Sequence, residues 1–295
     1  MNGVIVLNKP TGKTSHDMVY FIRRLTGIRR VGHTGTLDPD ATGVLPICIG
    51  VATKAAEYIT DGRKKYRAQL VLGSSTSTQD KSGEIIQCAD VTVTSEQICE
   101  AMHRFTGIIQ QIPPMYSAVK VGGKKLYELA RAGVEIERKS REIEVYAIAL
   151  VEYNEAERIA VIDVTCSKGT YIRTLCNDIG ESLGCFAHMG ELCRLESGRY
   201  KIEDSYTTEE LVRLADEGRL ADVLIGLEDI FADHDMVTVS GKDEFMVRNG
   251  TAPDIVGCED GQMLRVHARD GEFLCLSKVT EGKLKMQKSF WEVRS

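Results

Sequence analysis

Apolar residues recur along the chain with the three- and four-residue spacing that places them on one face of a helix. The first of these patterns covers residues 18–25, with Ser15 before it as a candidate N-cap and Gly27 after it as a stop signal. Similar patterns predict further helices at residues 98–105, 172–183 and 211–215. Each helix is expected to bury one face in the core.

Short apolar or alternating runs, bounded by turn residues, predict strands between these helices. The runs cover residues 4–7, 64–72, 143–153 and 159–166. Two other stretches differ from this pattern. Residues 32–46 contain three glycines and two prolines, which force the backbone to turn repeatedly. Residues 113–141 are basic and contain glycine, so we expect part of them to form a long exposed loop.

The sequence changes character after about Phe231, where short apolar pieces alternate with glycine or asparagine. Five pieces follow one another, at residues 236–240, 244–250, 262–271, 272–279 and 284–290. Several short strands in so short a stretch predict a small β-barrel or pseudo-barrel, with a boundary near Asp233. We therefore expect an α/β domain at residues 1–233 and a β-rich domain at residues 234–295.

The composition is that of an ordinary globular protein. The chain has 295 residues, of which 43% are hydrophobic and 27% charged, so the disordered and fibrous classes are excluded. Nine cysteines without a C-x-x-C pair favour reduced thiols over a disulfide framework. The apolar run at residues 44–52 is too short to span a bilayer, and the N-terminus lacks a signal-peptide pattern. We expect a cytoplasmic protein without a membrane segment.

Charge is distributed unevenly along the chain. There are 37 basic and 43 acidic side chains, and the net charge of −6 by itself argues against a nucleic-acid binder. However, basic side chains exceed acidic ones in residues 1–67 and 111–141, whereas residues 142–233 carry the acidic excess. Because attraction to phosphate depends on local lysines and arginines, one basic face for RNA is compatible with this total.

Motifs for nucleotides and metals do not fit. Gly12 and Lys13 follow a strand and precede a helix, but a phosphate-binding P-loop requires a further glycine where this chain has Leu7. The six histidines show neither H-E-x-x-H nor ligand spacing with cysteine. A P-loop phosphotransferase is therefore disfavoured, and we expect no cofactor and no metal.

The segment GHTGTLDPDATGVLP, residues 32–46, places a carboxylate in a stiff loop. Pro39 restricts Asp38 to extended backbone geometry, and glycines flank the pair on both sides. Two roles fit these residues: Asp38 starts a turn, which is a common use of Asp-Pro, or it presents an acid to a substrate. The spacing alone leaves both roles open.

This segment resembles the signature loop of the TruB family of tRNA pseudouridine synthases, whose pattern is GHTGTLDPxATGxLP. Four further segments resemble family motifs in the same order: LNKPTGKTS (7–15), KYRA (65–68), IPPMYSA (112–118) and GTYIR (169–173). The resemblance runs from residue 3 to about residue 199, and the C-terminal part resembles the PUA-like RNA-binding domain of bacterial members. It implies a pseudouridine-synthase fold with a mixed, largely antiparallel sheet flanked by helices.

The resemblance also implies roles for individual residues. Asp38 would be the catalytic nucleophile, and Arg173 the cation that keeps it ionised and oriented. Tyr66 would stack on uracil and handle a proton through its hydroxyl group. His33 would stack inside the RNA loop, and Asp80 would tether the active-site network. The residues expected to bind substrate are Lys9, His33, Asp80, Tyr171 and Leu192.

By the same resemblance, the protein isomerises the T-loop uridine at position 55 of tRNA, after flipping the base out of its stack. We expect a monomer that needs no protein partner. A non-catalytic RNA-binding protein of the same fold is the alternative, and Asp38 distinguishes the two because a pure binder needs no carboxylate in this loop. A flexible thumb at about residues 113–141 would close over the RNA with its basic residues Lys120, Lys124, Lys125, Arg131, Arg138, Lys139 and Arg141.

Overall fold

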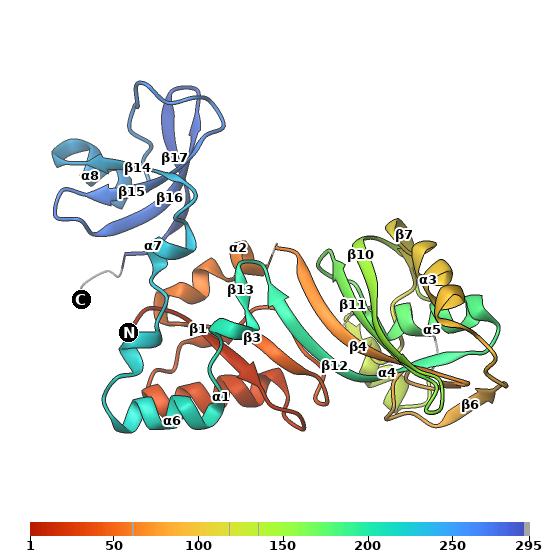
Figure 1. The fold of residues 1–295 in the computed structure, drawn as a ribbon. Helices are drawn as coiled ribbons and strands as arrows, with labels where there is room; N and C mark the ends of the chain where they lie inside the picture. Colours follow the sequence, from red (N-terminus) through yellow and green to blue (C-terminus); the bar gives the residue numbers. More distant parts are fainter. Residues whose placement is uncertain (61, 118, 135, 292–295) are drawn as a thin grey trace.

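The computed structural model describes residues 1–60, 62–117, 119–134 and 136–291. Its main feature is a long, curved sheet, with a smaller sheet of C-terminal residues standing at one end (Figure 1). The strands of the large sheet are β1 (Gly3–Lys9), β2 (Val31–His33), β3 (Thr42–Ile49), β4 (Lys64–Leu72), β7 (Gly107–Gln111), β10 (Arg141–Asn154), β11 (Ile159–Cys166), β12 (Ala187–Ser197) and β13 (Tyr200–Lys201).

Strands distant in sequence lie next to each other in this sheet. The order is β1-β3-β12-β4-β11-β10-β7, with β2 paired to β3 and β13 to β12. The pair β3–β12 is parallel, and the other described pairs of the sheet are antiparallel. The expected mixed, largely antiparallel sheet is therefore confirmed.

Strand β12 is a central strand that the pattern analysis missed. It joins β3 to β4 and so connects the N-terminal strands to the rest of the sheet. Its sequence AHMGELCRLES contains no β-branched residue, which removes the usual strand signal. Its pairing on both sides supplies what local propensity lacks.

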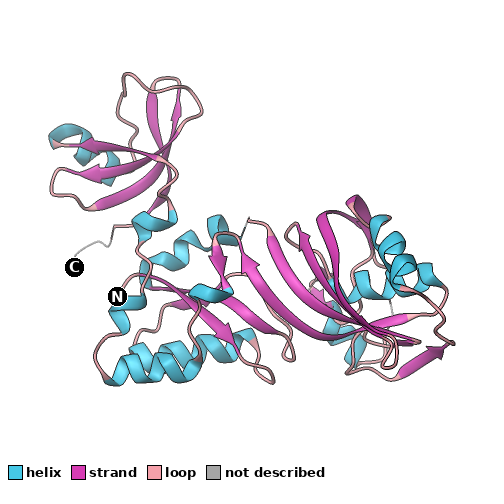
Figure 2. Ribbon diagram, viewed as in Figure 1, coloured by secondary structure: helices cyan, strands magenta, loops and turns pink. Residues whose placement is uncertain are grey.

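The helices pack at both ends of the sheet (Figure 2). α1 and α6 contact each other near β1 and β2, and α3 and α5 contact each other near β10 and β12. All four predicted helices are confirmed, and their buried apolar side chains form one core with those of the strands. Apart from α4 and α8, which are described below, the helices are α1 (Ser15–Thr26), α2 (Ala56–Thr60), α3 (Ser95–His103), α5 (Ile172–Leu183), α6 (Thr208–Asp216) and α7 (Leu227–Ile230), with 3-10 turns η1 (Gly50–Ala55), η2 (Ile202–Asp204) and η3 (Leu220–Val223).

The N-cap of α1 differs from the prediction. Thr14, not Ser15, caps the helix, because the Thr14 hydroxyl accepts from the Asp17 backbone and the Asp17 carboxylate accepts from the Thr14 backbone. Ser15 is the first residue of the helix and is buried. Its hydroxyl is thereby free for the contact with the Asp38 loop described below.

Two segments leave the large sheet, one after β4 and the other after β7. The first folds as a hairpin of β5 (Ser74–Thr76) and β6 (Ile85–Cys88). The second lies between β7 and β10 and contains β8 (Lys120–Val121), β9 (Lys124–Lys125) and α4 (Leu126–Arg131), so the expected long loop is partly structured. Ala118, the last residue of the IPPMYSA motif, lies outside the described residues. The side chains of four basic residues of this segment do so too: Lys120, Lys124, Lys125 and Arg131.

The C-terminal residues form a separate four-stranded sheet with its own core. Its strands are β14 (Asp235–Val239), β15 (Met263–Ala268), β16 (Phe273–Thr280) and β17 (Lys283–Ser289). The strand predicted at residues 244–250 is wrong, because most of this piece belongs to helix α8 (Gly241–Arg248). The ion pair between Glu244 and Arg248, 2.9 Å long and one turn apart, supports the helix.

The small sheet touches the rest of the protein through an aromatic cluster. Phe231 packs edge-on against Tyr58 and lies within 5.3 Å of the Phe290 ring, measured between ring centroids. The Lys54 ammonium group also donates to the Ser289 carbonyl oxygen at 2.9 Å. Among the described residues, no helix is both long and apolar enough to cross a membrane.

A close approach of β3 to β12 leads to the first prediction. Gly43 has φ +101°, and a Cβ atom there would lie 2.2 Å from the Arg194 carbonyl oxygen. Gly43→Ala should therefore lower the free energy of unfolding by at least about 3 kcal/mol, measured by urea denaturation. Gly27→Ala is the matched control: Gly27 has φ +70° but open space around it, so its cost should be about 1–2 kcal/mol. Equal costs for the two variants would contradict the close packing.

Candidate active site

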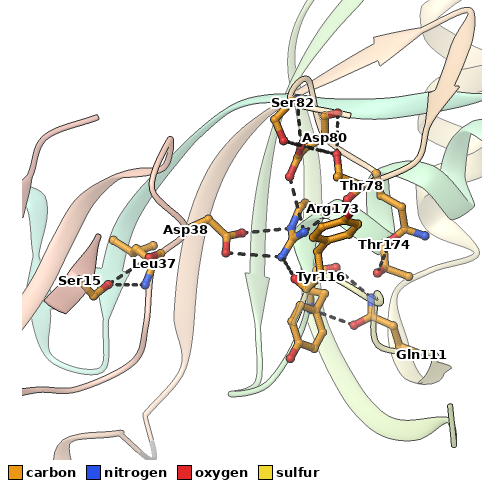
Figure 3. A network of polar contacts seen from close by, with 12 residues as sticks. Ser15, Leu37, Asp38, Thr78, Asp80, Ser82, Gln111, Tyr116, Arg173 and Thr174 are labelled. Atoms are coloured by element: carbon orange, nitrogen blue, oxygen red, sulfur yellow. Dashed lines mark hydrogen bonds and ion pairs between the residues drawn. The ribbon is translucent and has the colours of Figure 1, made fainter. Parts of the chain in front are cut away.

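The Asp38 loop lies between β2 and β3 and is fixed by contacts to its backbone. The Ser15 hydroxyl donates to the Leu37 carbonyl oxygen at 3.1 Å and accepts from the Leu37 amide at 2.8 Å (Figure 3). The Lys9 ammonium group donates to the Pro39 carbonyl oxygen at 2.9 Å, and the Gly12 amide donates to the same oxygen. The residues on both sides of Asp38 are thus held in place.

Asp38 faces the guanidinium group of Arg173 at the start of α5 (Figure 3). The Nε of Arg173 is 3.0 Å from one carboxylate oxygen of Asp38, and a terminal nitrogen is 3.5 Å from the other. The Arg173 side chain is 6% exposed, whereas that of Asp38 keeps 44% of its surface exposed. A buried cation therefore orients a carboxylate that still reaches solvent.

Arg173 also joins two other segments at this point. Its guanidinium group is 3.5 Å from the Asp80 carboxylate and donates to the Thr78 carbonyl oxygen, both between β5 and β6. It donates to the Tyr116 carbonyl oxygen at 2.9 Å, in the segment that follows β7. The Asp80 carboxylate is fixed in turn by Thr78 and Ser82. The expected link from Asp80 to the Arg173–Asp38 pair is present in the structure.

The pKa of Asp38 reflects two opposing effects. Removal from water raises the pKa above its ordinary value, and the positive charge of Arg173 opposes this rise. The nearby Asp80 carboxylate acts in the same direction as desolvation. An incompletely solvated carboxylate beside a cation is a group that can remain ionised at neutral pH and act as a nucleophile.

Tyr66 on β4 lies opposite Arg194 on β12. Ala68 and Leu192 form the pair two residues further along, so these four residues share one face of the sheet. Burial raises the pKa of the Tyr66 hydroxyl, with Arg194 opposing the rise, so the phenol stays protonated at neutral pH. Leu192 is 8% exposed and belongs to the main core.

Arg194 is a site residue that the sequence analysis missed. It is 1% exposed, and its guanidinium group donates to the Val44 carbonyl oxygen at 2.7 Å and to the Gly35 carbonyl oxygen at 2.9 Å. These two carbonyls lie on either side of Asp38, so Arg194 ties both ends of the loop to β12. Because β12 has no β-branched residues, the sequence pattern did not predict the strand on which Arg194 lies.

Lys9 is placed differently from the expectation that it binds substrate. The side chain is completely buried, and its ammonium group donates to the carbonyl oxygens of Pro10, Lys13 and Pro39. All three hydrogen atoms are therefore engaged within the protein. The structure assigns Lys9 to the support of the Asp38 loop.

His33 is the last residue of β2, and Tyr171 is the N-cap of α5. Burial lowers the pKa of His33, with Arg194 and His16 acting in the same direction, so the ring is neutral at neutral pH. The Nδ1 of His33 is buried without a hydrogen-bond partner in the described structure. The Tyr171 ring lies beneath the Arg141 guanidinium group, whose central carbon is 4.7 Å from the ring centroid.

The described residues hold no group of three or more His, Cys, Asp or Glu side chains that could bind a metal ion. They bring together the Asp38 carboxylate, its cationic partner Arg173 and the phenol of Tyr66, whose pKa is raised by burial and in part by the Asp38 charge. Leu192 lies on the same sheet face as Tyr66. This combination suits a nucleophile or general base acting beside a proton donor.

The buried ammonium group of Lys9 leads to the second prediction. Burial lowers its pKa from 10.5 to about 8, so between about pH 8 and 10.5 the unfolded chain binds a proton that the native protein does not. Stability conferred by this group therefore rises with pH across that window, by up to about 1.4 kcal/mol per pH unit. The difference in unfolding free energy between wild type and Lys9→Met, measured in urea, should rise accordingly.

Lys13→Met is the matched control for this experiment, because Lys13 is exposed in the same turn. Its stability should follow that of the wild type at every pH. If the free energies of unfolding of wild type and Lys9→Met ran parallel from about pH 8 to 10.5, Lys9 would not be a buried lysine with a lowered pKa.

Comparison with known proteins agrees with this arrangement. The model of the N-terminal domain of TruB family pseudouridylate synthases matches residues 23–172, and the model of the tRNA pseudouridylate synthase B C-terminal domain matches residues 173–232. The tRNA pseudouridine synthase B of Alkaliphilus oremlandii is 50% identical over 228 residues, which cover 77% of this chain and 75% of that protein. That of Geobacillus thermodenitrificans is 48% identical over 256 residues, 85% of each chain.

The fold comparison extends over almost the whole chain. A solved structure described as "Structure of H/ACA RNP bound to a substrate RNA containing 2'-deoxyuridine" matches with a TM-score of 0.72 and 25% sequence identity. The match covers 98% of this chain and 85% of that one. Together with the two family models, these likenesses establish that the chain belongs to the TruB family of pseudouridylate synthases.

Proposed function

We propose that the protein converts the T-loop uridine at position 55 of tRNA into pseudouridine, with Asp38 as the nucleophile and without a cofactor. The observation that carries the proposal is the Asp38 carboxylate, partly exposed and paired with the buried Arg173. The relatives named tRNA pseudouridine synthase B support tRNA as the substrate.

The reaction is an isomerisation that needs no redox step and no external group. The bond from uracil N1 to ribose C1′ breaks, the base turns within the site, and C5 bonds to C1′. The proton that C5 loses and the proton that N1 gains balance each other. A carboxylate nucleophile and a group that moves a proton are sufficient in kind. Attack of Asp38 on C6 of the base and attack on C1′ of the ribose are both compatible with its position.

Tyr66 is the group that would move the proton. Its raised pKa keeps the hydroxyl group protonated, and the ring lies on the same sheet face as Leu192. The flat phenol and the apolar leucine are suited to stack against a uracil base. Tyr171 would border the same site from the start of α5.

Access to a stacked uridine requires that the base leave its stack. The neutral ring of His33, at the end of β2, is suited to occupy the space that the base vacates, because inserting a neutral ring costs less than inserting a charged one. The basic segment between β7 and β10 would attract the phosphates, and the exposed Lys139 is among its described basic side chains.

The proposal extends to the organisation of the molecule. Residues 1–233 would form the catalytic domain and residues 234–295 a PUA-like RNA-binding domain, which the separate core of the C-terminal sheet supports. The absence of a membrane-spanning helix from the described residues is consistent with action on tRNA in the cytoplasm. The protein would act as a monomer and without a protein partner.

The nucleophile assignment leads to the third prediction. Asp38→Asn should reduce the single-turnover rate at least about 10³-fold, because the amide is not a nucleophile, and should leave tRNA affinity unchanged. Turnover is measured as release of tritium from C5 of uridine in a labelled tRNA transcript, and affinity by filter binding. Asp40→Asn is the matched control, since Asp40 is an exposed carboxylate of the same loop, and it should stay within about threefold of the wild type.

Substantial turnover by Asp38→Asn would exclude Asp38 as the nucleophile. A wild-type protein that binds tRNA but releases no tritium would instead indicate an RNA-binding protein that keeps the fold without the reaction.

A further inference from the structure

The segment between β7 and β10 has two ends that meet on the sheet. Gln111 is the last residue of β7 and Arg141 the first of β10, and they lie opposite each other in the register of the two strands. The 29 residues from 112 to 140 leave and return through this pair. These two residues therefore connect the segment to the large sheet.

Gln111 is bound to the backbone of Tyr171. Its side-chain amide donates to the Tyr171 carbonyl oxygen at 3.0 Å and its carbonyl oxygen accepts from the Tyr171 amide at 2.8 Å. Gln111 is 1% exposed, so these bonds are shielded from water. Tyr171 is the N-cap of α5 and gives the helix no side-chain cap bond of its own. Gln111 thus fixes the start of the helix that carries Arg173.

Arg141 holds the same residue through its ring. The guanidinium group lies over Tyr171 with its central carbon 4.7 Å from the ring centroid. Its Nε and one terminal nitrogen are buried and make no hydrogen bond within the described structure. The contact with the ring is therefore a principal interaction of this cation.

A third contact runs from the segment to the catalytic pair. The Tyr116 carbonyl oxygen accepts from Arg173 at 2.9 Å, on the guanidinium group that also binds Asp38. Gln111 and Arg141 thus contact the backbone and the ring of Tyr171, and the segment between them contacts the Arg173 guanidinium group through Tyr116. No role in substrate contact explains the buried Gln111 bonds, since both are made within the protein.

We propose that Gln111 and Arg141 are positioning residues, which hold Tyr171 from the two ends of segment 112–140 and thereby set the geometry of Arg173 against Asp38. The placement of the segment is coupled in this way to the catalytic carboxylate. The inference rests on the proposed function, because its readout is pseudouridine formation.

The test compares Gln111→Met, which keeps the length of the side chain and removes both bonds, with Gln110→Met. Gln110 is the matched control because it is the adjacent, exposed glutamine of the same strand, opposite Glu142. At saturating tRNA, Gln111→Met should lower the single-turnover rate at least about tenfold, while tRNA affinity stays within about twofold. Gln110→Met should leave both unchanged.

Two further variants separate positioning from a general loss of structure. Gln111→Glu keeps an acceptor for the Tyr171 amide but loses the donor to the Tyr171 carbonyl oxygen, so its rate should lie between those of the wild type and Gln111→Met. Where Gln111→Met is too unstable to measure, Gln111→Glu should still turn over more slowly than the wild type. Arg141→Lys keeps the charge but loses the flat guanidinium group, and should slow turnover with affinity retained. Because both residues act through Tyr171, the double variant Gln111→Glu/Arg141→Lys should lose less than the product of the two single losses.

Unchanged turnover in Gln111→Met, or in Gln111→Glu where the first does not fold, would overturn the proposal. A parallel loss of affinity and rate would overturn it too, because it would assign the residues to RNA binding. The variants are compared with a wild type that releases tritium. A wild type that releases none would reject the proposed function, whereas the results above reject only the positioning role of Gln111 and Arg141.

Discussion

The structure depends on one buried guanidinium group. Arg173 is almost inaccessible to water, so each of its nitrogens requires an acceptor within the protein. The acceptors come from three places distant in sequence: Asp38, the hairpin of β5 and β6 with Thr78 and Asp80, and Tyr116. Because the buried guanidinium group needs these hydrogen-bond acceptors, the three segments lie together around it. The Asp38 carboxylate is thereby oriented before any substrate arrives.

A second requirement is that the loop around Asp38 keep its shape. Two further buried cations do this through carbonyl oxygens: Lys9 binds beneath the loop, and Arg194 binds on either side of it. Burial of a cation without a paired carboxylate is costly, and the lowered pKa of Lys9 expresses that cost. The fold tolerates it at the site where a rigid backbone contributes to function.

Much of the architecture could be predicted from local pattern. The helix and strand at residues 172–183 and 64–72 are as predicted because their apolar spacing and flanking glycines agree with their tertiary setting. Strand β12 and helix α8 were missed, since the first lacks β-branched residues and the second is a short apolar piece that fits either structure. Asp38 was recognised through a continuous motif. Arg194 and Gln111 lie far from that motif in sequence, and their importance follows from which strands pair, which no local pattern encodes.

The most direct test of this account is the pKa of Asp38, followed by carbon-13 NMR of the labelled carboxyl group. In the wild type, the pKa should lie above the ordinary value of 3.8, because desolvation outweighs the charge of Arg173. In Arg173→Met the same burial acts without the cation, so the pKa should rise further. A pKa that stays the same or falls when Arg173 is replaced would contradict the central claim that this buried guanidinium group keeps Asp38 ionised.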